Sequence, residues 1–314
     1  MIQLLAQTAT DDPPGDVLAG LLLVVLVGLI WAGAGAALSQ GARRGVDPIG
    51  LFGLASIFIL VGAWAILPDY GELVAGPPQR LIELAAVVIA GGAIVAAGTV
   101  CVQLGMGRGH HGVVWTISQS ALVIPFVAGI AMFGEPFVIH RGLGVALVVA
   151  SLALLGAAKE QAEHDAARPR TRVSWFGFAL LALVLLGISQ TCMSVPSHWD
   201  DWQDTANLRV PLLAIGRVSP MLVLLAVRRP RLNRAAILPV AYLTFNGICS
   251  HQILFIGMDK LRAADMVSIA FPMAVGTCIV AFAGYSLLII RESVSRRRLL
   301  GIAAGIAGVT LVAV

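Results

Sequence analysis

The chain has very little charge for its length. Only 12% of its 314 residues are charged, 58% are hydrophobic, and the mean hydropathy is +0.90. Soluble domains carry about 25% charged residues, so this composition excludes a soluble globular protein. The net charge of +4 does not favour a nucleic-acid partner, because the arginines lie in short gaps between apolar blocks. The composition therefore predicts an all-α integral membrane protein whose surroundings are a lipid bilayer.

Cysteine is scarce, and its spacing excludes two further classes of site. The chain has four cysteines, all inside apolar blocks, and no two of them have the spacing of metal ligands. We therefore expect neither a zinc site nor a disulfide, and no cofactor is predicted. Basic residues are also missing from residues 1–16. A secretory signal needs a positive start, so we expect the first apolar block to be kept as a membrane span.

An internal repeat is the most informative pattern that is present. The segment that closes the first half of the chain recurs at its C-terminal end, and in both copies a glutamate precedes a glycine by nine residues: Glu135 before Gly144, and Glu292 before Gly301. A repeat of this kind in so apolar a chain is typical of secondary transporters.

Ten apolar blocks are long enough to cross a bilayer, for which a helix needs about 20 residues. Since five spans is an odd number, the second set of five must be inverted relative to the first. The predicted architecture is ten transmembrane helices in two inverted-topology five-helix repeats. The predicted spans are 17–38, 48–67, 81–104, 112–133, 142–158, 174–196, 210–227, 236–258, 264–290 and 299–314.

The loop charges predict the orientation. The loops after the odd-numbered spans hold fifteen Lys and Arg, and the alternate loops hold five. Positive loops face the cytoplasm, so we expect both termini outside a bacterial-type cytoplasmic (inner) membrane. The predicted organisation is an extramembrane segment at 1–16, a first repeat at 17–158, a charged cytoplasmic linker at 159–173 and a second repeat at 174–314.

Short motifs recur in matching places of the two halves. They are Ile30-Trp31 in the first span, a proline at the start of spans 2 and 7 (Pro48, Pro211), Gly-Met at the end of spans 3 and 8 (Gly105-Met106, Gly257-Met258), and the two glutamates. This order resembles the ten-helix EamA-type members of the drug/metabolite transporter superfamily. The stretch from Met106 to Pro136 is most similar to sugar-type members such as rhamnose–proton symporters.

The chain departs from that family pattern in two places. Arg291 replaces the usual glycine before Glu292, and Gln190 occupies the place that Trp31 has in the first repeat. The family also often keeps both termini inside, whereas the charge count places them outside.

Among the candidate site residues, Arg217 has the highest free-energy cost of placement in a membrane. It lies near the midpoint of span 7, opposite Leu54 of the first repeat, so its charge belongs to the second half alone. Such an arginine either joins a helix–helix network or faces a water-filled site, where it would attract a carboxylate or phosphate. The sequence favours neither of these two roles of Arg217 over the other.

Other polar residues fall on matching faces of several spans. Any one of them usually joins helices by a hydrogen bond, but together they favour a polar central cavity. With Arg217, the proposed substrate-binding residues are Trp31, Gln103, Trp115, Gln119, Gln190, Asn246, Ser250 and His251.

Helix ends and prolines complete the list of candidates. Glu135 and Glu292 are predicted to cap helices or to hold a gate, on opposite faces of the membrane. Pro125, Pro220 and Pro272 are predicted to kink their spans.

The predicted function is secondary active transport of a small polar metabolite (a sugar, amino acid or organic acid) by alternating access. The candidate coupling ion is a proton, with His251 as its candidate carrier, and the protein is a monomer or homodimer. Multidrug export is the alternative, weakened by the lack of a glutamate in span 1 to bind a cation. An intramembrane hydrolase is the other alternative. It is disfavoured because Ser250 and His251 are adjacent and so point in different directions on a helix. We therefore predict that the protein is not an enzyme.

Overall fold

The structure is a computed structural model, which describes residues 14–67, 78–106, 114, 117–163, 175–199, 205–230, 233–288 and 296–313. Within these ranges the regular structure is entirely helical. The α-helices are α2 (Pro14–Arg43), α3 (Pro48–Ile66), α5 (Pro78–Met106), α7 (Val123–Phe133), α8 (Ile139–Glu163), α9 (Trp175–His198), α10 (Ala206–Arg228), α11 (Ile237–Phe245), α12 (His251–Arg262), α13 (Ala270–Leu288) and α14 (Arg296–Ala313). The all-α class is confirmed.

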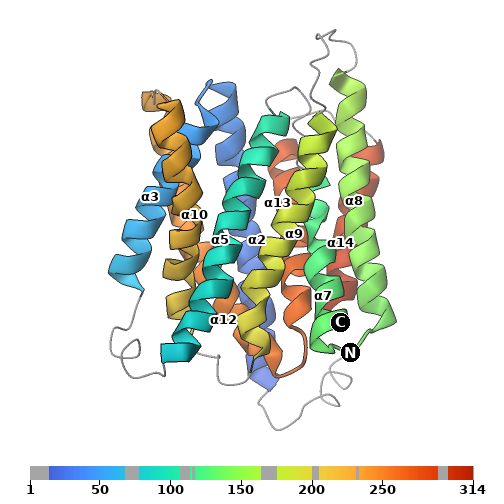
Figure 1. Ribbon diagram of the computed structural model, residues 1–314. Coiled ribbons are helices and arrows are strands. Elements are labelled where there is room, and N and C mark those ends of the chain that lie inside the picture. Colours follow the sequence, from blue (N-terminus) through green and yellow to red (C-terminus); the bar gives the residue numbers. More distant parts are fainter. Residues whose placement is uncertain are drawn as a thin grey trace.

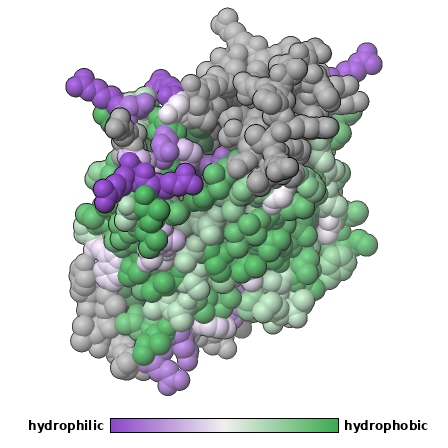
Figure 2. Space-filling view, turned by 45° about the horizontal axis from the view of Figure 1, so that its top comes forward, coloured by the Kyte–Doolittle hydropathy of each residue, from purple (hydrophilic) through white to green (hydrophobic). Residues whose placement is uncertain are grey.

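Several helices are long and apolar enough to cross a membrane, which fits a multi-pass membrane protein. Five meet that standard among the described residues: Asp16–Leu38, Pro48–Ile66, Gln79–Gly105, Phe176–His198 and Ala206–Arg228. Shorter apolar helices cover Ile117–Phe133, Ile139–Ser151, Val267–Ala281 and Leu299–Val312. Figure 2 shows the result on one face, where hydrophobic side chains form a broad area and hydrophilic ones gather toward its ends.

The helices lie side by side in one bundle (Figure 1). Helix α5 packs between α9 and α10, and α2 packs between α12 and α13. Helix α3 packs on α10 and α11, and α8 packs along α14. In Figure 1, α2 begins and α14 ends at the same end of the bundle.

The repeated segment forms one of the close contacts between these helices. A Cβ atom on Gly144 of α8 would lie 2.8 Å from the carbonyl oxygen of Gly308 in α14, and one on Gly308 would lie 2.8 Å from the carbonyl oxygen of Gly144. Ser151 of α8 donates a hydrogen bond of 2.6 Å to the carbonyl oxygen of Gly301. Small residues let helices approach in this way, so the two copies of the repeat hold the halves together.

Two of the three prolines that were predicted to kink their spans closely follow a 3₁₀ turn. Pro125 and Pro272 are the third residues of α7 and α13, each behind a short 3₁₀ turn, Ser120–Leu122 and Val267–Ile269. Each 3₁₀ turn continues into its α-helix, so that Ile117–Phe133 and Val267–Ala281 are single helical segments, and each proline lies inside its segment just after the irregular turn. Pro220 does lie inside α10, as expected.

A π-helical turn at Asn246–Ser250 joins α11 to α12 and was not predicted. Such turns are rare and often occur at functional sites. Two of the proposed substrate-binding residues, Asn246 and Ser250, are the first and last residues of this π turn.

Candidate functional site

A cavity of about 180 Å³ lies among the helices of both halves. Cavities of this order hold a ligand about the size of a small aromatic molecule. Seven of the nine predicted binding residues line it: Trp31, Gln103, Gln119, Gln190, Arg217, Asn246 and His251. Helices α2, α3, α5, α9, α10, α11 and α13 contribute its other walls, with Phe52, Leu38 and Phe271 among the apolar ones.

Two predicted binding residues are not part of this lining. Ser250 is fully buried behind it, where its Oγ accepts a hydrogen bond of 3.1 Å from Nε1 of Trp31 and donates one to the carbonyl oxygen of Asn246. It therefore fixes the indole of Trp31 at the cavity wall. Trp115 lies outside the described residues.

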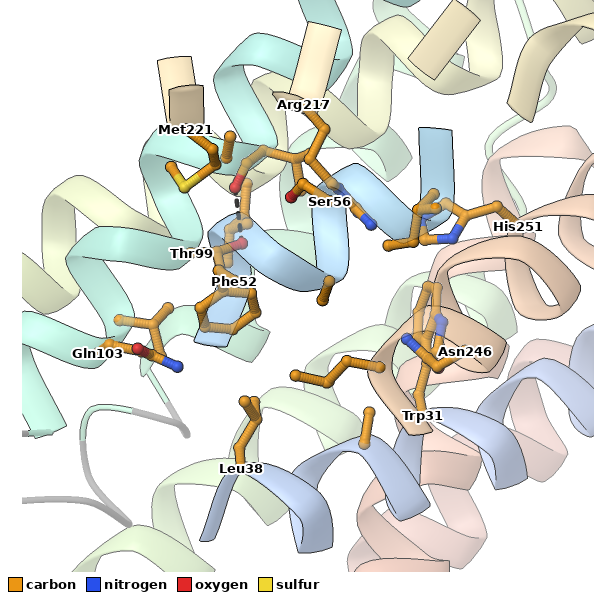
Figure 3. A pocket seen from close by; sticks show the side chains of 18 of the residues that line it. Trp31, Leu38, Phe52, Ser56, Thr99, Gln103, Arg217, Met221, Asn246 and His251 are labelled. Atoms are coloured by element: carbon orange, nitrogen blue, oxygen red, sulfur yellow. Dashed lines mark hydrogen bonds between the residues drawn. The ribbon is translucent and has the colours of Figure 1, made fainter. Parts of the chain in front are cut away.

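Arg217 stands at the middle of α10 and extends from it toward His251 (Figure 3). Among the described residues its guanidinium forms neither a hydrogen bond nor an ion pair. Placing an unpaired arginine at mid-membrane costs about 2.5–3.5 kcal/mol or more unless water or a ligand reaches it. Because part of its surface faces the cavity, water or a ligand is what can offset that cost here.

Three amide side chains in the same lining are also incompletely satisfied. The side-chain oxygens of Gln103, Gln190 and Asn246 are buried without a hydrogen-bond partner. A buried polar atom without a partner is expensive to keep. Three of them around one cavity indicate a surface that is completed by something else.

The cavity lies toward one end of the bundle. Its lining reaches Leu38 near the end of α2, Gln103 near the end of α5 and Met221 in the second half of α10. At the opposite end of the same helices, buried polar side chains hold the helices together. We call that region the sealed end.

Arg209 is the centre of the first contact at the sealed end. Its side chain is 0% exposed, and its Nη1 donates hydrogen bonds to Oγ of Ser197 (2.7 Å) and to Oδ1 of Asp259 (2.8 Å). Its Nε donates to Oγ1 of Thr205 (3.0 Å), and its guanidinium lies 5.7 Å from the ring centre of Phe255. This ion pair joins α9, α10 and α12.

Glu135 is the centre of the second contact. Its side chain is buried, and Oε1 lies 2.8 Å from Nε2 of His198 and accepts a hydrogen bond from the backbone N–H of Ser268 (2.9 Å). Nδ1 of His198 lies 3.0 Å from the carbonyl oxygen of Ser194, and its ring stacks on Phe133 at 3.9 Å. Since the carbonyl oxygen of Ser194 can only accept, Nδ1 carries the hydrogen of that bond and Nε2 faces the carboxylate. This contact joins α9 to the ends of α7 and α13.

The sequence analysis identified only some of the polar residues at the sealed end. Glu135 was predicted to cap a helix or to hold a gate, and it does bridge three segments at the sealed end. Glu292 lies outside the described residues. Arg209 was placed in a loop, but it is the fourth residue of α10 and fully buried. His198, Ser197 and Asp259 were missed, because each stands near the end of an apolar block, where a polar residue is unremarkable.

One detail of the alternative enzyme hypothesis also changes. Oγ of Ser250 lies 3.4 Å from Nδ1 of His251, closer than their adjacency predicted. The hydroxyl is nevertheless engaged with Trp31 and Asn246 and does not line the cavity.

Known proteins resemble the chain in fold alone. No protein-family model matches it, and no curated protein matches it. A solved crystal structure described only as that of a protein shares 11% sequence identity with it, covers 96% of each chain and has a TM-score of 0.67. The fold of the whole chain therefore exists in another protein, and the function must be inferred from the site.

Proposed function

We propose that this protein is a secondary active transporter that moves a small polar metabolite across a bacterial-type cytoplasmic membrane by alternating access. The observation that carries the proposal is a polar cavity, walled by both halves of the chain, that approaches one end of the bundle while the other end is sealed. A carrier has a central site that reaches one side of the membrane at a time. Membership of the drug/metabolite transporter superfamily, as an EamA-type member, is part of this proposal.

The packing supports ten spans in two inverted five-helix repeats. Under that repeat, α2 corresponds to α9 and α5 to α11 with α12. The contact of α5 with α9 then corresponds to that of α12 with α2, and α8 with α14 pairs equivalent helices. Gly28 and Gly187, three residues before Trp31 and Gln190, occupy equivalent positions. Each allows a close approach, to Ala274 of α13 and to Ile124 of α7, respectively.

The charges support the orientation in this proposal. The cavity lies toward the end where α2, α5 and α10 end, and arginines cluster at the ends of α2 and α10 and in the residues that follow them, with one more, Arg108, after α5. By the positive-inside rule that end faces the cytoplasm. The structure then represents an inward-facing carrier, and the sealed end, where α2 begins and α14 ends, lies outside.

The cavity is unsuited to the two alternative functions. Its lining contains Arg217 and, among the described residues, no Asp or Glu, so a cationic drug would be desolvated without a counter-charge. For hydrolysis, the serine that lies next to the cavity histidine His251 is Ser250, which does not line the cavity.

Counterflow in proteoliposomes tests the transport proposal. The purified protein is reconstituted with a panel of unlabelled sugars, amino acids and organic acids, and entry of the labelled counterpart is measured, with and without an inward proton gradient. Saturable counterflow of at least one compound is expected. Counterflow of none, together with hydrolysis of esters or peptides, would contradict the proposal. Protein-free liposomes and liposomes containing the Arg217→Gln variant are the controls.

A further inference from the structure

The charge in the cavity narrows the class of substrate. Arg217 brings a full positive charge to the lining, and no described lining residue is acidic. Its fork of N–H donors is unused among the described residues. A guanidinium fork matches a carboxylate with two parallel hydrogen bonds.

The neighbouring amides present donors to the same space. In Figure 3 the amide nitrogens of Gln103 and Asn246 lie on the cavity side of their side chains. Their oxygens are the buried atoms without partners. The donors that Arg217 and these two amide nitrogens present to the cavity suit a carboxylate, whereas the unpartnered oxygens are acceptors and give no preference for an anion.

The rest of the lining limits the charge and the chemical groups of the anion that can bind. One arginine balances one negative charge, so a dianionic phosphate would leave a net charge in the cavity that no lining residue neutralises. An ammonium group on the ligand would likewise meet no carboxylate in the described lining. The rings of Trp31 and Phe52 and the side chain of Leu38 offer apolar contact on the side away from Arg217 (Figure 3).

We propose that the cavity binds a small monocarboxylate, with an uncharged apolar or hydroxylated body, through Arg217. The inference rests on the proposed function for its biological meaning, because it names the substrate class of the same site. Binding by itself, however, can be measured without transport.

Binding to the detergent-purified protein is the test, with matched pairs of probes: an acid, its carboxamide, the corresponding amino acid and a phosphate ester of similar size. The variants are Arg217→Gln, Arg217→Lys and Arg228→Gln. Arg228 is on the same helix but exposed, so its variant removes an equal charge outside the cavity. The readout is the shift of the thermal unfolding midpoint with ligand concentration, which gives a Kd.

The wild-type protein and Arg228→Gln should bind a monocarboxylate about 10- to 100-fold more tightly than its carboxamide, the range expected for a hydrogen bond to a charged group. Arg217→Gln should lose that preference, and Arg217→Lys should keep part of it. Equal binding of acid and amide by the wild-type protein overturns the inference, as does a stronger preference for the phosphate or the amino acid. If a neutral sugar binds and shows counterflow instead, the transport proposal survives without this inference. If no probe in the panel binds, the inference is also overturned.

Discussion

Two arginines on α10 have opposite surroundings. Arg209 is 0% exposed, and Asp259, Ser197 and Thr205 accept its hydrogen bonds. Arg217, eight residues later, faces the cavity and has no hydrogen-bond or ion-pair partner among the described residues. The fold can evidently satisfy a buried arginine when the role is structural. The difference indicates that Arg209 holds helices together and that Arg217 is kept for a ligand.

The largest effect is expected when the satisfied arginine is removed. Arg209→Gln breaks the buried ion pair with Asp259, and breaking such a pair by changing one partner costs about 3–5 kcal/mol. The thermal unfolding midpoint in detergent should fall sharply. The double variant Arg209→Met with Asp259→Leu should lie closer to the wild type than either single change, because neither charge is then stranded. An unchanged midpoint for Arg209→Gln would remove the distinction between the two arginines.

A steric substitution away from both arginines provides a reference for the size of that fall in the unfolding midpoint. Gly308→Leu forces a side chain against the backbone of Gly144, and overpacking of this kind costs about 1–3 kcal/mol. Ala307→Leu is the matched control, since Ala307 is exposed. Only Gly308→Leu should lower the thermal unfolding midpoint. Equal effects would show that α8 and α14 do not pack at this glycine pair.

The smallest effect on stability is expected at the unsatisfied arginine. Arg217→Gln removes a charge that has no protein partner, so the unfolding midpoint without ligand should stay unchanged or rise. Arg228→Gln controls for the change in net charge. A fall as large as that of Arg209→Gln would mean that Arg217 is structural, and the sequence alone could not choose between these roles.

The sequence predicted the cavity residues better than the sealed end, for a physical reason. Polar side chains such as Gln190, Asn246 and Arg217 are conspicuous in the middle of apolar helices, where each carries a cost. Arg209 and Asp259 stand near helix ends, where a charge usually reaches water. Their burial depends on which helices meet there, and no local pattern encodes that.

The backbone conformation at the cavity could likewise not be predicted from the sequence. The segment Asn246–Ser250 contains no proline or other residue pattern that predicts a π turn. The hydroxyl of Ser250 in this turn accepts a hydrogen bond from Trp31, which is more than 200 residues away in the chain. The prolines were recognised, but their positions relative to the 3₁₀ turns were not. Pro125 and Pro272 both follow such a turn by three residues, and no local pattern in the sequence encodes that.

The central claim is that the cavity reaches one side of the membrane while Glu135 and His198 help to close the other. Labelling of a cysteine at Gln190 in the cavity wall, in a background without the four native cysteines, tests it most directly. A membrane-impermeant thiol reagent is applied to right-side-out and to inside-out vesicles. We predict labelling from the cytoplasmic side alone, and from both sides once Glu135→Gln removes the carboxylate that accepts hydrogen bonds at the sealed end. Equal labelling from both sides without that change, or the same one-sided labelling with it, would contradict the account.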